Sequence, residues 1–171
     1  MKTLMQPNKG DYSDFYSSYL NLIKGDDYYA LILDQIDLMI NLFQEKGNKW
    51  ADTAYAEGKW TPKEVLGHII DTERIMAFRA LCFARGEKSS LPGFDQEHYV
   101  LNARFSDVSI EDLLEDFVTQ RISLLSLIKT LPSNSHDLVG YANGSPITPR
   151  ALLWIIPGHF EHHYQIFQEK Y

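Results

Sequence analysis

The sequence contains only one cysteine, Cys82, among its 171 residues. A single cysteine cannot form a disulfide within the chain, so a disulfide-stapled fold is excluded and a reducing compartment is expected. The longest apolar run, residues 151–157, is far shorter than the roughly 20 residues that a helix needs to cross a bilayer. The start of the chain also lacks the apolar core of a secretory signal. We therefore expect a cytoplasmic protein with no membrane partner.

Positive charge is also scarce. The chain has 16 Lys and Arg against 23 Asp and Glu, which gives a net charge of −7. It shows no Lys/Arg cluster of the size that neutralising a nucleic-acid backbone requires, so we expect no nucleic-acid partner. The hydrophobic fraction of 44% and the charged fraction of 23% are ordinary for a globular protein. The length suits one domain with a substantial core.

Apolar residues recur at intervals of three and four in four segments, which predicts four amphipathic helices. Thr61, Ser109 and Thr148 are the expected N-caps of the last three, two of them followed by proline at the first helical position. No strand alternation is sustained, although the polar link before the last helix has room for a small hairpin. The expected helices cover residues 28–46, 62–85, 110–130 and 149–171.

These four helices predict an all-α fold, a four-helix bundle with long crossover connections. We expect residues 1–10 to form a flexible N-terminal tail and residues 11–171 to form a single helical-bundle domain. Exposed apolar strips on such helices would suit a homodimer.

His159 and His163 are the first candidates for a functional site. Helical residues four apart have Cβ atoms about 6 Å from each other, and His159 lies on the apolar stripe of its helix. Two adjacent buried imidazoles need partners, which a metal ion supplies to both at once and core hydrogen bonds supply one by one. Glu161 does not complete an H-E-x-x-H motif, because it follows His159 by two residues. Both interpretations remain open at this point.

The second helix carries further polar residues among its apolar positions. His68 faces a packed strip, where a hydrogen-bonded core histidine is the default interpretation. Glu73 lies on an apolar face and needs either an arginine from a neighbouring helix or a hydrogen bond to a histidine. Cys82 cannot share a metal with His68, since 14 helical residues separate them by about 21 Å.

The connections are rich in aromatic residues. Trp50, Tyr55 and Trp60 are expected to fold back onto the bundle, chiefly as packing residues. The connection after the second helix is long but aromatic enough to be ordered. We expect Phe94, His98 or Tyr99 to cover one end of the bundle, with plain loop packing as the alternative.

Three blocks, in this order, resemble the DinB/YfiT-like family of metal-binding four-helix bundles, and the resemblance spans about residues 11–171. The first block is YAEGKWTPKEVLGHIIDTER at residues 55–74, the second is PGFDQ at 92–96, and the third is GHFEHH at 158–163.

The resemblance implies that His68, His159 and His163 coordinate one divalent metal ion, with His162 left outside the site. Nickel or zinc is the expected ion, and iron or manganese also suits three imidazoles. An open fourth position is typical of a catalytic site.

The resemblance also implies a metal-dependent enzyme acting on a small-molecule substrate. We expect the aromatic linkers around Trp60 and Tyr99 to shape its pocket. The ion would activate either a low-molecular-weight thiol, as in a thiol S-transferase, or water, as in a hydrolase. No catalytic side chain is indicated. The alternative is a non-catalytic, metal-stabilised ligand-binding or stress-related module.

Overall fold

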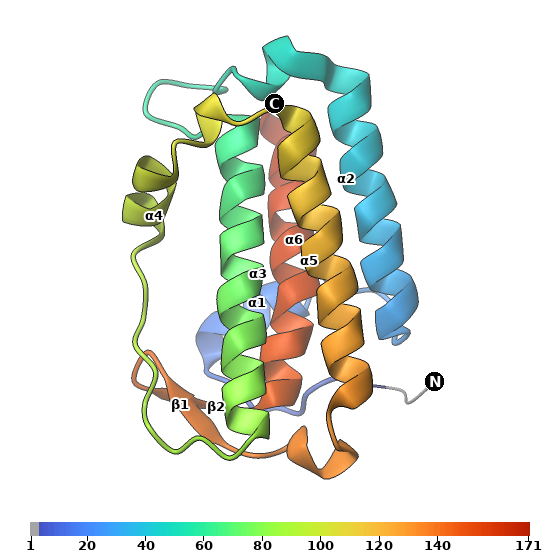
Figure 1. Ribbon diagram of the computed structural model, residues 1–171, viewed down its shortest axis with the longest axis vertical. Coiled ribbons are helices and arrows are strands. Elements are labelled where there is room, and N and C mark those ends of the chain that lie inside the picture. The colour runs from blue at the N-terminus through green and yellow to red at the C-terminus, as the bar shows by residue number, and fades with distance from the viewer. Residues whose placement is uncertain (1–3) are drawn as a thin grey trace.

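The computed structural model describes residues 4–171 of the chain, and within this part four long helices form a bundle (Figure 1). These are α2 (Tyr28–Ala51), α3 (Pro62–Ala84), α5 (Ile110–Thr130) and α6 (Pro149–Lys170). The α3 helix packs against α5 and α6, and α2 packs against the same two helices. The predicted all-α bundle is therefore confirmed.

The order of the helices requires long connections. Figure 1 shows that α2 and α6 run in one direction and that α3 and α5 run in the other. Because α3 and α5 are parallel neighbours, the chain must return along the bundle between them. This return segment, residues 85–109, contains α4 (Gln96–Ala103) and lies beside α3.

Short elements lie before and between the long helices in the chain. The α1 turn packs against α6, and the two strands pair antiparallel with Tyr141 opposite Pro146, which confirms the small hairpin. Leu91 of the return segment pairs with this hairpin, donating to the Tyr141 carbonyl at 2.9 Å and accepting from the Asn143 amide at 3.0 Å. The short elements are η1 (Asp14–Tyr16), α1 (Ser17–Leu20), η2 (Phe105–Asp107), η3 (Ser133–Ser135), β1 (Gly140–Ala142) and β2 (Ser145–Ile147).

The predicted helix starts are confirmed. At α3 the Thr61 hydroxyl accepts from the Glu64 amide at 3.3 Å, and the Glu64 carboxylate accepts from the Thr61 amide at 2.7 Å, which makes a capping box. The Ser109 hydroxyl accepts from the Asp112 amide at 3.0 Å and the Thr148 hydroxyl accepts from the Ala151 amide at 3.1 Å, which caps α5 and α6. Local side-chain chemistry thus fixes where these three helices begin.

The end of α2 differs from the prediction. Gly47 follows the predicted end of this helix and leaves the helical conformation at φ 72° and ψ −178°, but a further helical turn continues to Ala51. The Trp50 ring in this turn packs on Phe43 and Phe167, with centroids 5.2 and 5.7 Å away. The linker therefore begins at residue 52, because burial of Trp50 stabilises the extra turn.

The expected N-terminal tail is also shorter than predicted. Residues 1–3 lie outside the described residues, whereas Leu4 is only 1% exposed and belongs to the core. The Met5 carbonyl accepts hydrogen bonds from the Trp154 indole at 2.7 Å and from Arg150 at 3.2 Å. Leu4 and Met5 therefore belong to the domain, because α6 offers an apolar contact and two donors to them.

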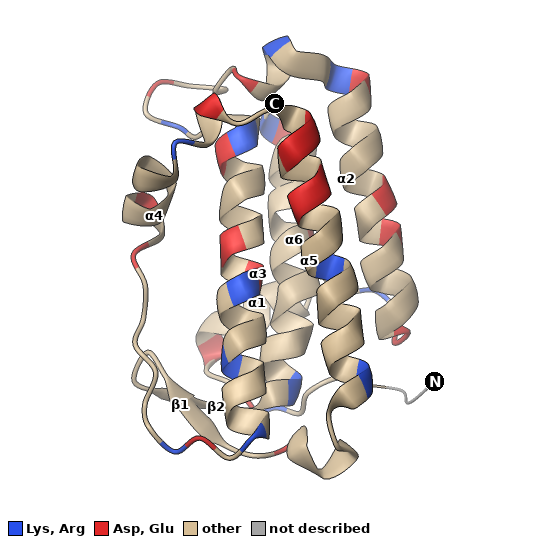
Figure 2. Cartoon of the chain, viewed as in Figure 1, with Lys and Arg blue, Asp and Glu red and all other residues tan. Residues whose placement is uncertain are grey.

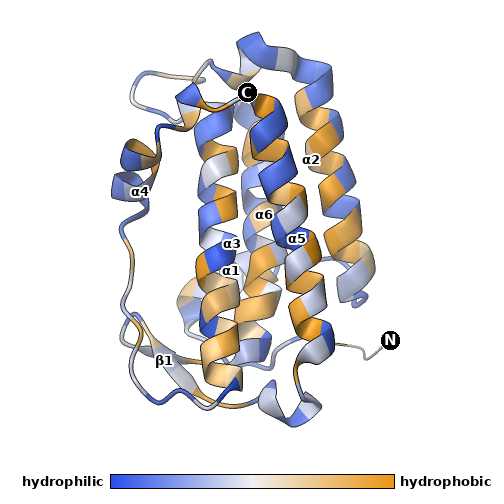
Figure 3. Ribbon diagram, in the orientation of Figure 1, coloured by the Kyte–Doolittle hydropathy of each residue, from blue (hydrophilic) through white to orange (hydrophobic). Residues whose placement is uncertain are grey.

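The core consists of two apolar clusters stacked along the bundle axis. One surrounds Trp154 and Tyr28, and the other contains Phe117 and Phe160. Figure 3 shows apolar and polar positions alternating along each long helix, as amphipathic packing requires. Figure 2 shows Lys and Arg interspersed with Asp and Glu along the chain. Among the described residues, no helix is both long and apolar enough to span a bilayer.

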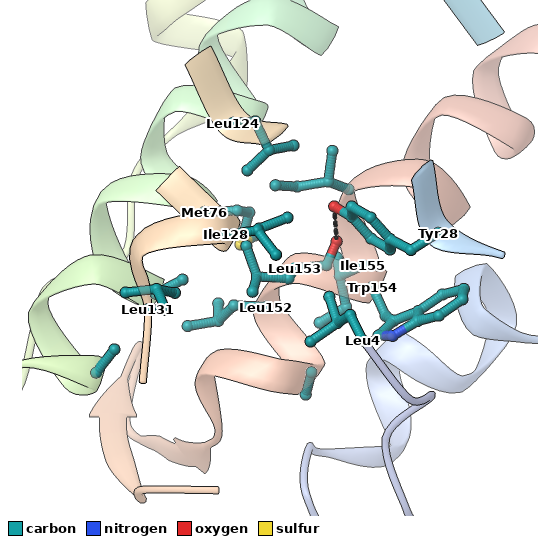
Figure 4. Packing of buried hydrophobic residues seen from close by; sticks show 14 of the residues in the cluster. Leu4, Tyr28, Met76, Leu124, Ile128, Leu131, Leu152, Leu153, Trp154 and Ile155 are labelled. Atoms are coloured by element: carbon teal, nitrogen blue, oxygen red, sulfur yellow. Dashed lines mark hydrogen bonds between the residues drawn. The ribbon is translucent and has the colours of Figure 1, made fainter. Parts of the chain in front are cut away.

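Pro157 lies inside α6 and has no amide hydrogen to donate to the Leu153 carbonyl one turn earlier. The Tyr28 hydroxyl of α2 donates to that carbonyl at 2.9 Å, as the dashed line in Figure 4 shows. The carbonyl released by the proline is therefore satisfied by α2, and it does not orient the histidines.

Replacing Tyr28 with Phe should lower the free energy of unfolding by about 1–3 kcal/mol, because a buried carbonyl loses its donor while the ring remains. Tyr29→Phe is the matched control, since the neighbouring ring makes no hydrogen bond among the described residues, and its effect should stay within about 0.5 kcal/mol. Urea unfolding followed by circular dichroism measures both. Equal effects of the two substitutions would contradict this role for Tyr28.

Candidate metal centre

Three histidines from two helices meet at one point inside the bundle. The Nε2 atom of His159 lies 3.1 Å from Nε2 of His68 and 3.0 Å from Nε2 of His163. One nitrogen from each residue falls within 4.8 Å of the other two. His68, His159 and His163 are only 3%, 5% and 9% exposed, respectively. The structure therefore brings together the three histidines that the family resemblance singled out.

Gly158 precedes His159 and Gly67 precedes His68, and each glycine lets another segment pack closely beside the histidine. A Cβ atom on Gly158 would lie 2.6 Å from the Tyr19 backbone carbonyl, so only glycine lets α1 approach α6 here. The Tyr19 ring then packs edge-on against His159, with centroids 5.5 Å apart. A Cβ atom on Gly67 would clash with the Phe105 ring. Both sides of the cluster are thus covered by other segments.

The buried surroundings keep the imidazoles neutral. Burial, aided by nearby histidines, lowers the pKa of His68 to about 4 and that of His163 to about 3, and it holds the pKa of His159 well below its usual value. Neutral imidazoles are the form that binds metal ions. Each has a single N–H, so three converging Nε2 atoms cannot all satisfy one another, whereas a cation would accept all three lone pairs.

One feature departs from the usual arrangement around a metal-binding histidine. The Nδ1 atom of His159 is buried and has no hydrogen-bond partner among the described residues. A ligand histidine normally donates this second N–H to a carbonyl or carboxylate. Here the edge-on Tyr19 ring packs against the imidazole instead.

The remaining sequence candidates lie outside the cluster. His162 is half-buried and packs its ring 5.3 Å from Tyr19, but it does not belong to the group of converging nitrogens. His98 on α4 is exposed. Cys82 lies on α3 beyond the reach of His68, as its separation along the helix predicts.

Glu73 forms the predicted ion pair with an arginine of a neighbouring helix. Arg121 of α5 donates from Nε to the Glu73 carboxylate at 2.9 Å, and a second contact joins Nη2 to the other oxygen. Arg121 also donates to the Gln35 side chain at 2.6 Å, which in turn donates to the Pro157 carbonyl at 3.1 Å. This buried network joins all four long helices two residues before His159.

Two hollows meet at the histidines. The first encloses about 170 Å³ and extends from His68 and His159 along α3 as far as Arg79. The second is lined by His163 and Trp60. Trp60 also packs 5.0 Å from the His68 ring, which agrees with its predicted place in the pocket. Gln96 of the return segment lines both hollows.

Phe94, one of the three residues expected to cover the bundle from the return segment, lines the first hollow, whereas Tyr99 lies outside the pocket that it was expected to shape. Tyr99 is 46% exposed on α4 and lines neither hollow, because Asp95 caps α4 and sets a helix phase that turns Tyr99 outward. Tyr16 and Tyr19 from the N-terminal segment line the first hollow instead. Their helical spacing is visible in the sequence, but nothing local shows that this segment crosses α6.

The fold is a helical bundle with a buried cluster of three histidines, and the comparisons identify its family. The model described as the DinB superfamily matches residues 34–167, so the chain belongs to this superfamily. The structure is similar to that of YfiT from Bacillus subtilis, with a TM-score of 0.68, 18% sequence identity and 85% of each chain covered. YfiT is described as a probable metal-dependent hydrolase with an unusual four-helix bundle topology. A comparison with curated proteins gives no match.

Replacing Arg121 with Met should lower the free energy of unfolding by about 3–5 kcal/mol, because Glu73 would keep a buried charge without a partner. Arg74→Met is the matched control on the adjacent helix, since its ion pair with Asp116 is largely exposed and should contribute at most about 1 kcal/mol. Denaturant unfolding compares the two variants. A cost for Arg121→Met no greater than that for Arg74→Met would contradict the structural role of the buried pair.

Proposed function

We propose that this protein is a metal-dependent enzyme in which His68, His159 and His163 hold one divalent ion. The observation that carries the proposal is the convergence of three neutral imidazole nitrogens within 4.8 Å beside a cavity. Such a donor set suits zinc or nickel, and also iron or manganese. Three protein ligands leave a coordination position for a substrate or a nucleophile, which is the layout of catalytic rather than structural zinc sites.

An ion in this site would supply a positive charge that lowers the pKa of a bound water or holds a thiol as thiolate. The chain supplies the surroundings. Burial raises the pKa of the Tyr16 and Tyr19 hydroxyls, so both remain protonated and able to donate hydrogen bonds in the cavity. The aromatic side chains around the histidines limit access of bulk water, which strengthens these polar interactions.

Hydrolysis and thiol transfer use this arrangement differently. Hydrolysis needs room for one organic substrate, which the first hollow provides. Thiol transfer needs room for a thiol and an electrophile, and the second hollow reaches His163, a member of the cluster that does not line the first hollow. The two hollows therefore favour a small-molecule thiol as a co-substrate, with hydrolysis as the simpler alternative.

A non-catalytic role is the alternative from another class. An ion bound by His68 of α3 and by both histidines of α6 would join two helices and stabilise the native state by mass action. The protein would then serve as a ligand-binding or stress-related module.

Activity assays on zinc- and nickel-loaded protein distinguish these roles. The assays are hydrolysis of 4-nitrophenyl esters and conjugation of cysteine or glutathione to monochlorobimane. We expect metal-dependent turnover in at least one assay, and His68→Ala should lower kcat/KM by about 100-fold or more, the size of a lost electrostatic contribution. His98→Ala should leave kcat/KM unchanged, because this histidine is exposed on α4.

Stoichiometric metal binding that raises the melting temperature without turnover in any assay would contradict the enzymatic proposal. That outcome would instead support the non-catalytic module.

A further inference from the structure

Arg79 is a buried cation that has no carboxylate partner in residues 4–171. The residue is only 4% exposed. Its guanidinium makes one hydrogen bond among the described residues, from Nη2 to the Pro92 carbonyl at 2.6 Å. The other buried arginines are both paired: Arg121 with Glu73, and Arg150 with Asp137 at 2.8 and 2.9 Å. An unpaired buried guanidinium is costly, so its retention here calls for a reason.

Arg79 lies on the same strip of α3 as His68. Eleven residues separate them, which at 3.6 residues per turn places them within about 20° of each other on the helix. Both line the first hollow, so the hollow runs from the histidine cluster to the guanidinium. The Cα atoms of the two residues are roughly 16 Å apart along the helix axis. Because an arginine side chain leans toward the helix N-terminus, a distance on the order of 10 Å remains between the guanidinium and the histidine cluster.

Thr72 supplies a second unsatisfied group between these ends. It is 5% exposed and lines the same hollow, and its hydroxyl has no hydrogen-bond partner among the described residues. Buried hydroxyls are normally hydrogen-bonded. A polar atom of a ligand in the hollow would satisfy Thr72, just as an anionic group would satisfy Arg79.

The other walls of the hollow are mainly aromatic and apolar. Phe94 packs on the Arg79 guanidinium at 5.9 Å, and no Asp or Glu lines the hollow among the described residues. The positive charge is therefore left for an incoming anion. The lining residues between the two ends include Tyr16, Tyr19, Met76, Phe94 and Ile155.

We propose that the hollow binds a small carboxylate, whose carboxylate pairs with Arg79 and whose reactive end lies at the histidine cluster. A polar atom near its middle accepts from or donates to Thr72, and its body packs against the aromatic walls. This inference rests on the proposed function, since it names the class of substrate or co-substrate for that site.

The single guanidinium favours a carboxylate over a phosphate ester. Its planar donors match the two oxygens of a carboxylate, and one unit charge balances one unit charge. A phosphate monoester carries nearly two charges at neutral pH, and no lysine or second arginine lines this hollow among the described residues.

Binding of ω-mercapto acids to the cobalt-loaded protein tests the inference. The probes are 6-mercaptohexanoate, its neutral amide and 6-mercaptohexyl phosphate, each read by the cobalt–thiolate absorption band and by calorimetry. We expect the acid to bind at least tenfold more tightly than the amide, as a charge-assisted hydrogen-bonded pair implies, and more tightly than the phosphate. This comparison needs only the unmodified protein.

Variants then assign the preference to Arg79. Arg79→Gln should bring the affinities for acid and amide to within about twofold of each other, and Arg79→Lys should keep part of the difference because it keeps the charge. Arg85→Gln is the control, since it removes the same charge from the exposed end of α3 and should keep the full preference. Circular dichroism and thermal melting confirm that each variant folds.

The outcomes separate this inference from the function on which it rests. A cobalt–thiolate band with equal affinities for acid and amide would overturn the carboxylate site and leave the metal-dependent function standing. Tighter binding of the phosphate would overturn the assignment to carboxylates. No cobalt binding at all would overturn the proposed function and this inference with it.

Discussion

The packing of α3 against α6 is the contact on which the rest of the structure depends. It brings His68 beside His159 and His163, so the cluster exists only where these two helices touch. Because α3 also lies parallel to α5, the chain must return along the bundle, and this return segment supplies Gln96 to both hollows. The topology and the site therefore have one cause, which is the position of α3 between α5 and α6.

Polar groups inside the bundle hold this packing in register. The network of Glu73, Arg121 and Gln35 reaches α6 at the Pro157 carbonyl and the Glu161 carboxylate. Tyr28 satisfies the carbonyl that the proline releases. Buried polar groups that must all be paired tolerate few alternative arrangements. The segment of α6 that carries the histidines is thereby fixed by contacts from the other three long helices.

Local patterns predicted much of the fold and only part of the site. The N-caps and the 3.6-residue periodicity are local, so the starts of α3, α5 and α6 followed from the sequence. His68 was different, because its helix allowed a simple core role and only the family resemblance joined it to the α6 pair. Arg79 and Tyr19 could not be placed, since their role depends on how the return segment and the N-terminal segment lie on the bundle. The extra turn at Trp50 was missed because it depends on a tertiary contact with Phe167 of α6.

Metal content tests the central claim most directly. We would purify the protein without a metal-affinity tag and measure bound metals by plasma mass spectrometry, alongside a His159→Ala/His163→Ala double variant. The account predicts about one equivalent of a divalent transition metal in the unmodified protein and none in the variant. Absence of metal from both proteins, even after zinc or nickel is added, would show that the three histidines are core residues and would contradict the account.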